Sequence, residues 1–177
     1  MSFSKQEKCT IGFRKLPFYS LFETGKFLTA SWKVVFREQA ASLTTAVIGP
    51  YQTEFLGEKA IIPDHKLMVA AMETKDEAHY VCALLNSSLS RFFAEAYFIE
   101  TSISTHILDY IKIPKFSSGA DLHKKLSSVS QRAHELTSRG EEKKLVAVEQ
   151  EIDSLAAKLW DISPKELKQI QTALNEK

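Results

Sequence analysis

Short apolar runs set the pattern of the first half of the chain and predict β-strands rather than helices. In the run 33–37, Val34 and Phe36 share one face, while Lys33 and Arg37 share the other face around Val35. This alternation is typical of a strand with one solvated face. Similar runs bounded by turn residues predict further strands, which cover 42–48, 60–62 and 66–71. Residues 1–30 are rich in aromatic residues, and we expect short strands and loops there.

The apolar period changes at Thr74, where helical spacing begins. Thr74-Lys75-Asp76-Glu77 reads as a capping box, in which the threonine hydroxyl accepts from the Glu77 amide and the Glu77 carboxylate accepts from the Thr74 amide. Apolar residues then recur at helical spacing, so one helix is predicted from about 75 to 97. β-branched residues become frequent after Phe98. They predict the end of the helix and then a mostly covered strand at 107–113, which Pro114 ends.

The last third of the chain predicts three helices. Two apolar stripes, at 122–136 and 145–159, alternate between spacings of three and four residues. Ser138-Arg139-Gly140 breaks the pattern between them, with the glycine in its usual C′ position. We expect the two helices to form an antiparallel hairpin over 119–160. Ser163-Pro164-Lys165-Glu166 is a second capping box with proline at the first helical position, and it predicts a short terminal helix.

Together these elements predict an α+β fold. A small, mainly antiparallel β unit packs on the 75–97 helix and is followed by a C-terminal helical hairpin and a short terminal helix. The predicted division is a β-rich unit with that helix at 1–116 and a helical spacer or interaction element at 117–177. The composition, 44% hydrophobic and 25% charged, is that of a globular protein with one sizeable core or two small ones.

Charge is unevenly divided along the chain. The net charge is +1, but residues 1–75 carry ten Lys/Arg against seven Asp/Glu (+3), and residues 76–177 carry thirteen against fifteen (−2). This balance permits an anionic partner for the N-terminal part without requiring one. No apolar run approaches the roughly 18 residues of a membrane span, and the N-terminus lacks the apolar segment of a secretory signal. We therefore expect a cytoplasmic protein with no membrane contact.

Motifs for catalysis are missing from the sequence. Only six glycines occur, none in a G-x-G phosphate loop, and neither an HExxH nor a G-x-S-x-G motif is present. His123 and His134 fall near one helical azimuth but about 16 Å apart along the axis, too far to share a metal. Cys9 and Cys82 offer neither a disulfide framework nor metal-ligand spacing, and Cys82 is expected in the core. The sequence predicts no catalytic residue, no metal, no cofactor and no independent enzyme.

One stretch, 84–116, carries a resemblance to a known family. A helix with Leu84-Leu85-Asn86-Ser87-Ser88 leads through a Ser/Thr-rich bend to Ile107-Leu108-Asp109-Tyr110-Ile111-Lys112-Ile113-Pro114, and a long amphipathic helix with His123 follows. This order resembles the C-terminal target-recognition domains of TaqI-like, type IIG N6-adenine DNA methyltransferases, and Glu77-Ala78-His79-Tyr80 belongs to the likeness. The resemblance covers about 33–175. The specificity subunits of type I restriction systems share the same order of strand, proline and spacer helix.

The resemblance implies a DNA sequence-recognition module of a restriction-modification system. Such a module binds duplex DNA and directs a methyltransferase or endonuclease catalytic domain or subunit. The family's Asn/Asp-Pro-Pro-Tyr/Phe loop and glycine-containing cofactor strand are missing from this chain, so catalysis and S-adenosylmethionine binding are not implied. Side chains suited to phosphates or base edges come from the β region and the bend. They are Arg14, Lys15, Lys33, Arg37, Gln39, Thr44, Thr45, Gln52, His65, Lys66, Ser102, Ser104, Thr105 and His106.

Other interpretations stay open for the whole chain and for single residues. A helical protein–protein interaction module would use the 119–160 hairpin and bind no nucleic acid. An exposed apolar strip on the helices would favour that module, whereas a continuous positive face on the β unit would favour DNA. Arg91 either pairs with Glu95 at the edge of the core or contacts DNA. Ser104 and Thr105 either contact DNA or hydrogen-bond to their own backbone in a turn.

Overall fold

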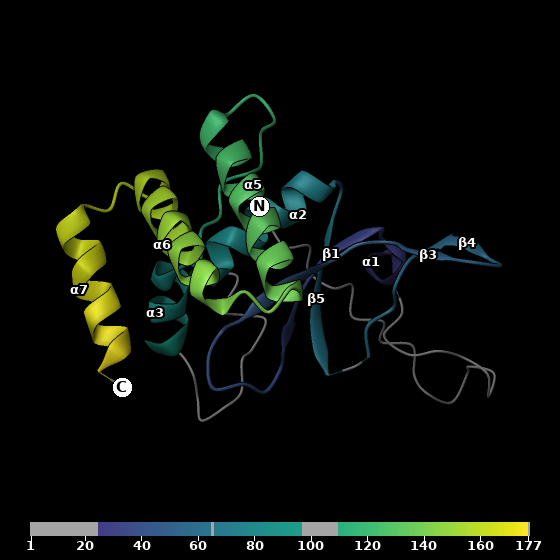
Figure 1. Cartoon of the computed structure of the whole chain (residues 1–177), viewed down its shortest axis with the longest axis horizontal. Helices are drawn as coiled ribbons and strands as arrows, with labels where there is room; N and C mark the ends of the chain where they lie inside the picture. The colour runs from purple at the N-terminus through teal and green to yellow at the C-terminus, as the bar shows by residue number, and fades with distance from the viewer. Residues whose placement is uncertain (1–24, 65, 97–109, 177) are drawn as a thin grey trace.

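The computed structural model describes residues 25–64, 66–96 and 110–176. These residues form an α+β fold, as the sequence predicts. An antiparallel three-stranded sheet lies beside a group of helices, and a separate two-stranded hairpin extends from the far side of the sheet (Figure 1). No described helix is long and apolar enough to cross a membrane.

The three-stranded sheet has the order β2-β1-β5. Its strands are β1 (Trp32–Arg37), β2 (Thr45–Ile48) and β5 (Leu67–Met72), and a single-turn helix, α1 (Lys26–Thr29), precedes β1. Val34 of the central strand lies opposite Val47 and Ala70, so its apolar face continues across all three strands. The runs at 33–37, 42–48 and 66–71 are thereby confirmed as strand regions. The run at 60–62 forms no strand, and Ile61 and Ile62 are exposed.

The separate hairpin was not predicted from the sequence. It consists of β3 (Tyr51–Thr53) and β4 (Gly57–Lys59), joined by a three-residue turn. The Thr53 hydroxyl accepts from the Leu56 amide at 3.0 Å and donates to the Gly57 carbonyl at 2.8 Å. Gly57 has φ +66°, a left-handed conformation that glycine adopts at no steric cost. Local contacts therefore close the turn.

The helix predicted over 75–97 is two helices, α2 (Lys75–Asn86) and α3 (Ser88–Ala96). Ser87 between them is extended, with ψ 150°, and its hydroxyl and amide both donate to the Leu84 carbonyl. This competing interaction ends α2 and changes the chain direction. At the start of α2 the Thr74 cap is confirmed, since the Glu77 amide donates to Oγ1 at 3.1 Å. The Glu77 carboxylate, however, accepts from Glu73 rather than from Thr74.

The C-terminal helices follow the prediction closely. They are α5 (Asp121–Ser138), α6 (Glu142–Leu159) and α7 (Pro164–Asn175). Gly140, with φ +68°, ends α5: its amide donates to Thr137, and the Glu141 amide donates to Leu136. These two bonds form a Schellman motif, which satisfies the last carbonyls of the helix. The capping box of Ser163 and Glu166 at the start of α7 is also confirmed.

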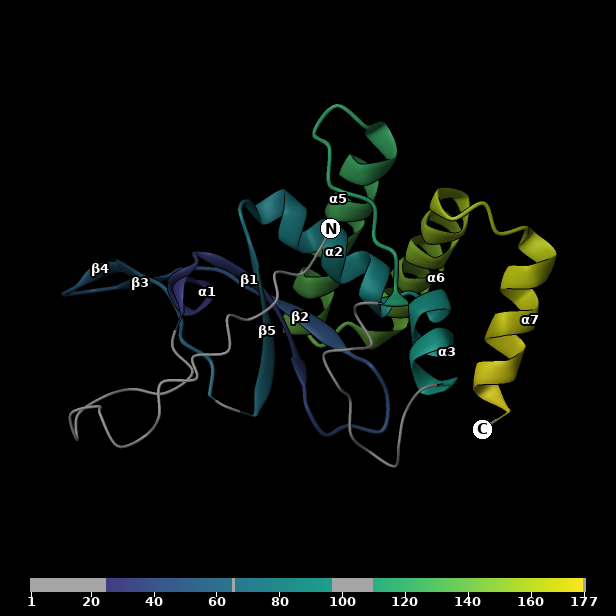
Figure 2. The ribbon, with the colours of Figure 1, turned by 180° about the vertical axis from the view of Figure 1, so that it is seen from behind.

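The core lies between the sheet and the helices. The apolar face of the sheet packs on α2, α2 packs on α5, and α5 packs on α6. Figure 2 shows α3 and α7 beside each other on the outer side of this group. Buried residues from both sides of position 116, such as Leu84, Leu126 and Ile152, belong to one continuous cluster. The C-terminal helices therefore share the core of the β-rich part.

The strand predicted at 107–113 is not formed in its described part. Residues 107–109 lie outside the described residues, and residues 111–113 have no strand partner. The segment was expected to be mostly covered, but only one side of its described part is covered. Ile111 and Ile113 are 8% and 5% exposed, while Tyr110, at 60%, and Lys112 are exposed. The Trp160 indole donates to the Lys112 carbonyl at 3.1 Å. A helix side chain thus takes the place of a neighbouring strand.

Candidate nucleic-acid interface

Four of the residues proposed from the sequence lie at one end of the three-stranded sheet. Arg37 ends β1 opposite Leu67, and Lys66 directly precedes β5. The Glu38 amide donates to the Lys66 carbonyl at 3.2 Å, which brings the two chain segments together. Gln39 and Thr44 belong to the connection from β1 to β2, and all four side chains are exposed. The end of the sheet therefore presents two cations and two uncharged hydrogen-bonding groups.

The charge at this end is mixed rather than strongly positive. Glu38 and Asp64 are exposed beside Arg37 and Lys66, so the four formal charges sum to zero. The described residues thus form no continuous positive face on the β unit. Direct contact to an anion would depend on the two cations themselves and not on a broad field around them.

Lys33 and Thr45 do not belong to this exposed end. The sequence predicted Lys33 on a solvated strand face, either free or in contact with DNA, but Lys33 is 0% exposed. Its ammonium group donates to the carbonyls of Ala30 and Ile61, and burial lowers its pKa. Thr45 is 5% exposed, and its hydroxyl lies 3.3 Å from Cys82 Sγ. Both residues hold the scaffold together, and we remove them from the candidate interface.

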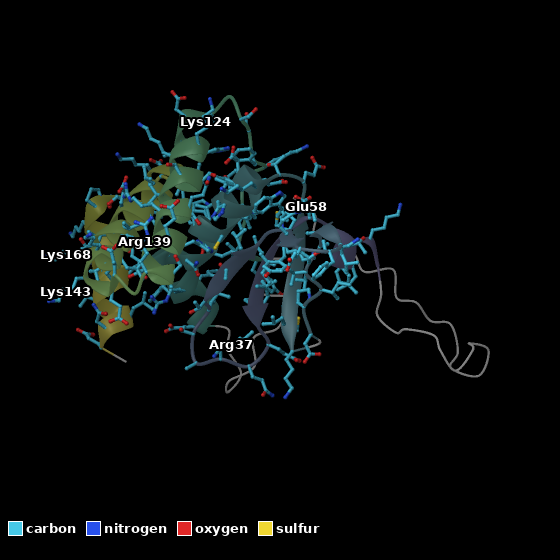
Figure 3. The ribbon with its side chains drawn as sticks, turned by 45° about the vertical axis from the view of Figure 1, so that its right-hand side comes forward. Arg37, Glu58, Lys124, Arg139, Lys143 and Lys168 are labelled. Atoms are coloured by element: carbon cyan, nitrogen blue, oxygen red, sulfur yellow. The ribbon has the colours of Figure 1, made fainter. Side chains whose placement is uncertain are left out.

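The remaining predicted contacts lie elsewhere. Gln52 is exposed on β3, which follows the opposite end of β2. Figure 3 shows Arg37 at one end of the sheet and Glu58, on the strand paired with β3, away from it. The other proposed contacts lie outside the described residues; they are Arg14, Lys15, His65, Ser102, Ser104, Thr105 and His106.

Asn86 fixes the position of the strand that follows Thr44. Its side-chain oxygen accepts from the Thr45 amide at 2.8 Å, and its side-chain nitrogen donates to the Thr45 carbonyl at 2.9 Å. The amide thus pairs with the first residue of β2 much as another strand would. The Asn in the Leu-Leu-Asn-Ser stretch therefore has an internal, structural partner.

A buried histidine, His79, and a half-buried one, His134, join the same strand to the helices. The Val47 amide donates to His134 Nε2 at 3.0 Å, so Nε2 holds no proton and Nδ1 donates to the Ser130 carbonyl at 2.8 Å. The rings of His134 and His79 meet edge to face, with centroids 4.9 Å apart. His79 Nδ1 lies 3.2 Å from the Ser130 hydroxyl. Burial, reinforced by His134 and Lys75, lowers the pKa of His79 to about 4, against a smaller opposing effect of Asp76.

The Ile-Pro segment is attached to α2 and α5 by aromatic side chains. The Tyr80 hydroxyl donates to the Pro114 carbonyl at 3.1 Å, and burial raises the pKa of Tyr80 to about 12. The Tyr80 ring lies 4.5 Å from the His123 ring, centroid to centroid. His123 Nδ1 in turn accepts from the Ser117 amide at 3.1 Å. Residues that carry the family resemblance are thus used in internal contacts.

The described residues contain no group of three or more His, Cys, Asp or Glu side chains that could hold a metal ion. Cys82 is a fully buried core residue, as predicted, and burial raises its pKa to about 11. The thiol therefore stays protonated near neutral pH and is a poor nucleophile. Arg91 Nε is buried without a hydrogen-bond partner, and the residue as a whole is half-buried.

Several residues that support the candidate end were not predicted from the sequence. Asn86 and His134 hold β2, and Asp153 holds the start of α3 through Ser88. A role for Asn86 could have been expected, because Asn86 lies in the stretch that resembles the family. His134 and Asp153 carried no such signal, since each acts on a residue more than 60 positions away.

Comparisons with known proteins identified no relative of this chain. Neither protein-family models, nor curated protein sequences, nor solved structures gave a significant match to the chain.

Proposed function

We propose that the protein is a DNA sequence-recognition module that directs a methyltransferase or endonuclease catalytic partner. The proposal rests on the resemblance of residues 33–175 to target-recognition domains of N6-adenine DNA methyltransferases. The same proposal assigns the protein to the cytoplasm, together with its DNA. Catalysis belongs to the partner in this scheme.

The observation that carries the proposal is the gathering of Arg37, Lys66, Gln39 and Thr44 at one exposed end of the sheet. Arginine and lysine suit phosphate oxygens and guanine, and glutamine can form two hydrogen bonds with adenine. The side chains come from separate segments, yet the pairing of β1 with β5 and the hold of Asn86 on β2 keep them near one another. Donors carried on backbone segments that are held in this way suit the phosphate contacts that set register on a duplex.

An interaction module on the helices has less support. Such a module would present an exposed apolar strip on the 119–160 hairpin. Among the described residues of that hairpin, one large apolar side chain is exposed: Val146, which is 54% exposed. Phe92 of the neighbouring helix α3 is 38% exposed. Two single residues on different helices do not form a strip, and isolated exposed apolar residues are normal on protein surfaces.

Replacing Arg37 and Lys66 together with alanine should weaken binding to duplex DNA about tenfold at 150 mM salt. The two cations would each contact phosphate, so the slope of log K against log salt should fall by about 2 in magnitude. Fluorescence anisotropy with labelled random-sequence and selected duplexes, at 50 and 150 mM salt, measures both quantities. The catalytic partner is included in a second series.

The matched control is the Lys143→Ala/Lys168→Ala protein, which loses the same charge from exposed positions on α6 and α7 (Figure 3). Its affinity should stay within about twofold of wild type, because a general charge effect is small at this salt concentration. Equal losses in both double variants would contradict a specific role for the sheet end. Absence of salt-dependent binding by the wild-type protein, with and without the partner, would refute the proposed function itself.

A further inference from the structure

The β3–β4 hairpin collects the largest exposed apolar side chains of the described residues. Phe55 and Leu56 form the tip of its turn and are 88% and 69% exposed, and Tyr51 of β3 is 62% exposed. Ile61 and Ile62, which follow β4, are 40% and 64% exposed. Phe55 and Leu56 are adjacent, so the most strongly exposed apolar side chains lie together at the tip. Adjacent exposed apolar side chains of this kind can mark an interaction site.

The hairpin has little support of its own. Each strand has three residues, and among the described elements β3 and β4 pack mainly on each other. Figures 1 and 2 both show the pair extending beyond the sheet, away from the helices. Isolated two-stranded hairpins are marginal in water unless a third strand or another surface covers them. A binding partner would therefore stabilise this element as well as cover its apolar side chains.

Charge argues against DNA as that partner. Glu54 and Glu58 flank the apolar tip, and Lys59 is the single cation of the hairpin, so its net charge is −1. All three side chains are exposed. Acidic groups beside a phosphate backbone repel it, and DNA-contacting surfaces are strongly enriched in cations. The cations Arg37 and Lys66 stand at the other end of β1, a strand of six residues, roughly 20 Å long.

A second copy of the chain fits poorly on the edge of β4. In an antiparallel pair with two-fold symmetry, one residue of each strand lies directly opposite itself. Centring on Glu58 or Lys59 would place like charges opposite each other, which is destabilising. Centring on Gly57 would pair the charged residues with Phe55 and Leu56, which belong to the turn.

We propose that the β3–β4 hairpin docks into the catalytic protein that this module serves. Phe55 and Leu56 would enter an apolar groove, and cations at its rim would face Glu54 and Glu58. This inference rests on the proposed function and names its protein partner. DNA then meets the Arg37 end of the sheet, while the catalytic protein holds the opposite end.

The test uses a DNA N6-adenine methyltransferase chain from the organism that encodes this protein, with its catalytic and cofactor-binding regions. Its affinity for the full-length protein is measured by isothermal titration calorimetry. The Phe55→Ser/Leu56→Ser protein should bind at least tenfold more weakly than wild type, because tip side chains inserted in a groove supply much of such an interface. The Val146→Ser protein, altered at a lone exposed apolar residue of α6, should bind like wild type.

Crossing the variants with both ligands separates the two proposals. The hairpin variant should keep wild-type affinity for DNA, and the Arg37→Ala/Lys66→Ala protein should keep its affinity for the methyltransferase chain. An unaltered affinity of the hairpin variant for that chain, or no complex with wild type, overturns the docking proposal. Loss of DNA binding by the hairpin variant would instead identify a DNA wedge. A wild-type dimer in sedimentation that the variant lacks would identify self-association, and either result also overturns docking.

Discussion

The Asp153→Ala protein is expected to unfold with a free energy about 3 kcal/mol below that of wild type. Asp153 of α6 is 6% exposed, and its carboxylate accepts three hydrogen bonds. The Ser88 amide donates at 2.7 Å, the Ser88 hydroxyl at 2.6 Å and the Gln171 side chain at 2.8 Å. Ser88 is the first residue of α3, so the carboxylate also faces the positive end of that helix. Alanine would leave these donors unpaired between three helices.

Chemical denaturation with urea, followed by circular dichroism, measures this loss. The Asp153→Asn protein should lose roughly half as much, because its amide oxygen can still accept from Ser88 while its nitrogen cannot. The Ser154→Ala protein is the control, since Ser154 is exposed and donates only within α6. A value for Asp153→Ala within 1 kcal/mol of this control would show that the carboxylate does not join the helices.

The break at Ser87 explains why the role of Asp153 could not be predicted from the sequence. Apolar residues keep helical spacing on both sides of Ser87, so periodicity predicts one continuous helix over 75–97. The break depends on the Ser87 hydroxyl at Leu84 and on the distant carboxylate of Asp153, which supplies the cap of the second helix. Local patterns carry no information about a cap that arrives from another helix. Caps within one segment were predicted better: the box of Ser163 with Glu166 is complete, and the Thr74 hydroxyl accepts from Glu77 as expected.

The position of strands was predictable, but the exposure of their faces was not. Alternation in 33–37 correctly separates Val34 and Phe36 from Lys33 and Val35. It then implies a solvated second face, whereas Lys33 and Val35 are 0% and 6% exposed. Which face is covered depends on segments that cross it, here those of Ala30 and Ile61. Lys33 can lie under these segments because its ammonium group donates to two of their backbone carbonyls.

Short elements escaped prediction for a related reason. The strands of the β3–β4 hairpin are three residues long, too short for a period to be counted. The sequence signal that could have been used is Gly57, which directly follows the three turn residues 54–56. A glycine at such a place is typical of a three-residue hairpin loop. Conversely, Ile111 and Ile113 have the burial of a strand but pair with none, because burial and strand pairing are separate properties. Sequence alternation reports the first of these.

Lowering the pH from 7 to 5 is expected to cost the protein about 2 kcal/mol of stability through His79 alone. Burial and the neighbouring His134 lower the pKa of His79 to about 4 in the folded protein. The unfolded chain has an ordinary imidazole pKa near 6.5, so between these values it binds a proton that the folded protein does not. Protons therefore favour the unfolded state, and stability falls as the pH drops from about 6.5 towards 4.

The measurement compares urea denaturation of wild type and the His79→Gln protein at pH 7, 6 and 5. The amide of glutamine can replace the contact with Ser130 but does not titrate, so the variant should lose about 2 kcal/mol less than wild type between pH 7 and 5. Carboxylates titrate equally in both proteins, and their effect cancels in this difference. Because His79 touches His134, which holds Val47 of β2, acid should loosen the sheet from the helices first. Parallel pH dependences of the two proteins would show that His79 takes up protons equally in the folded and unfolded states.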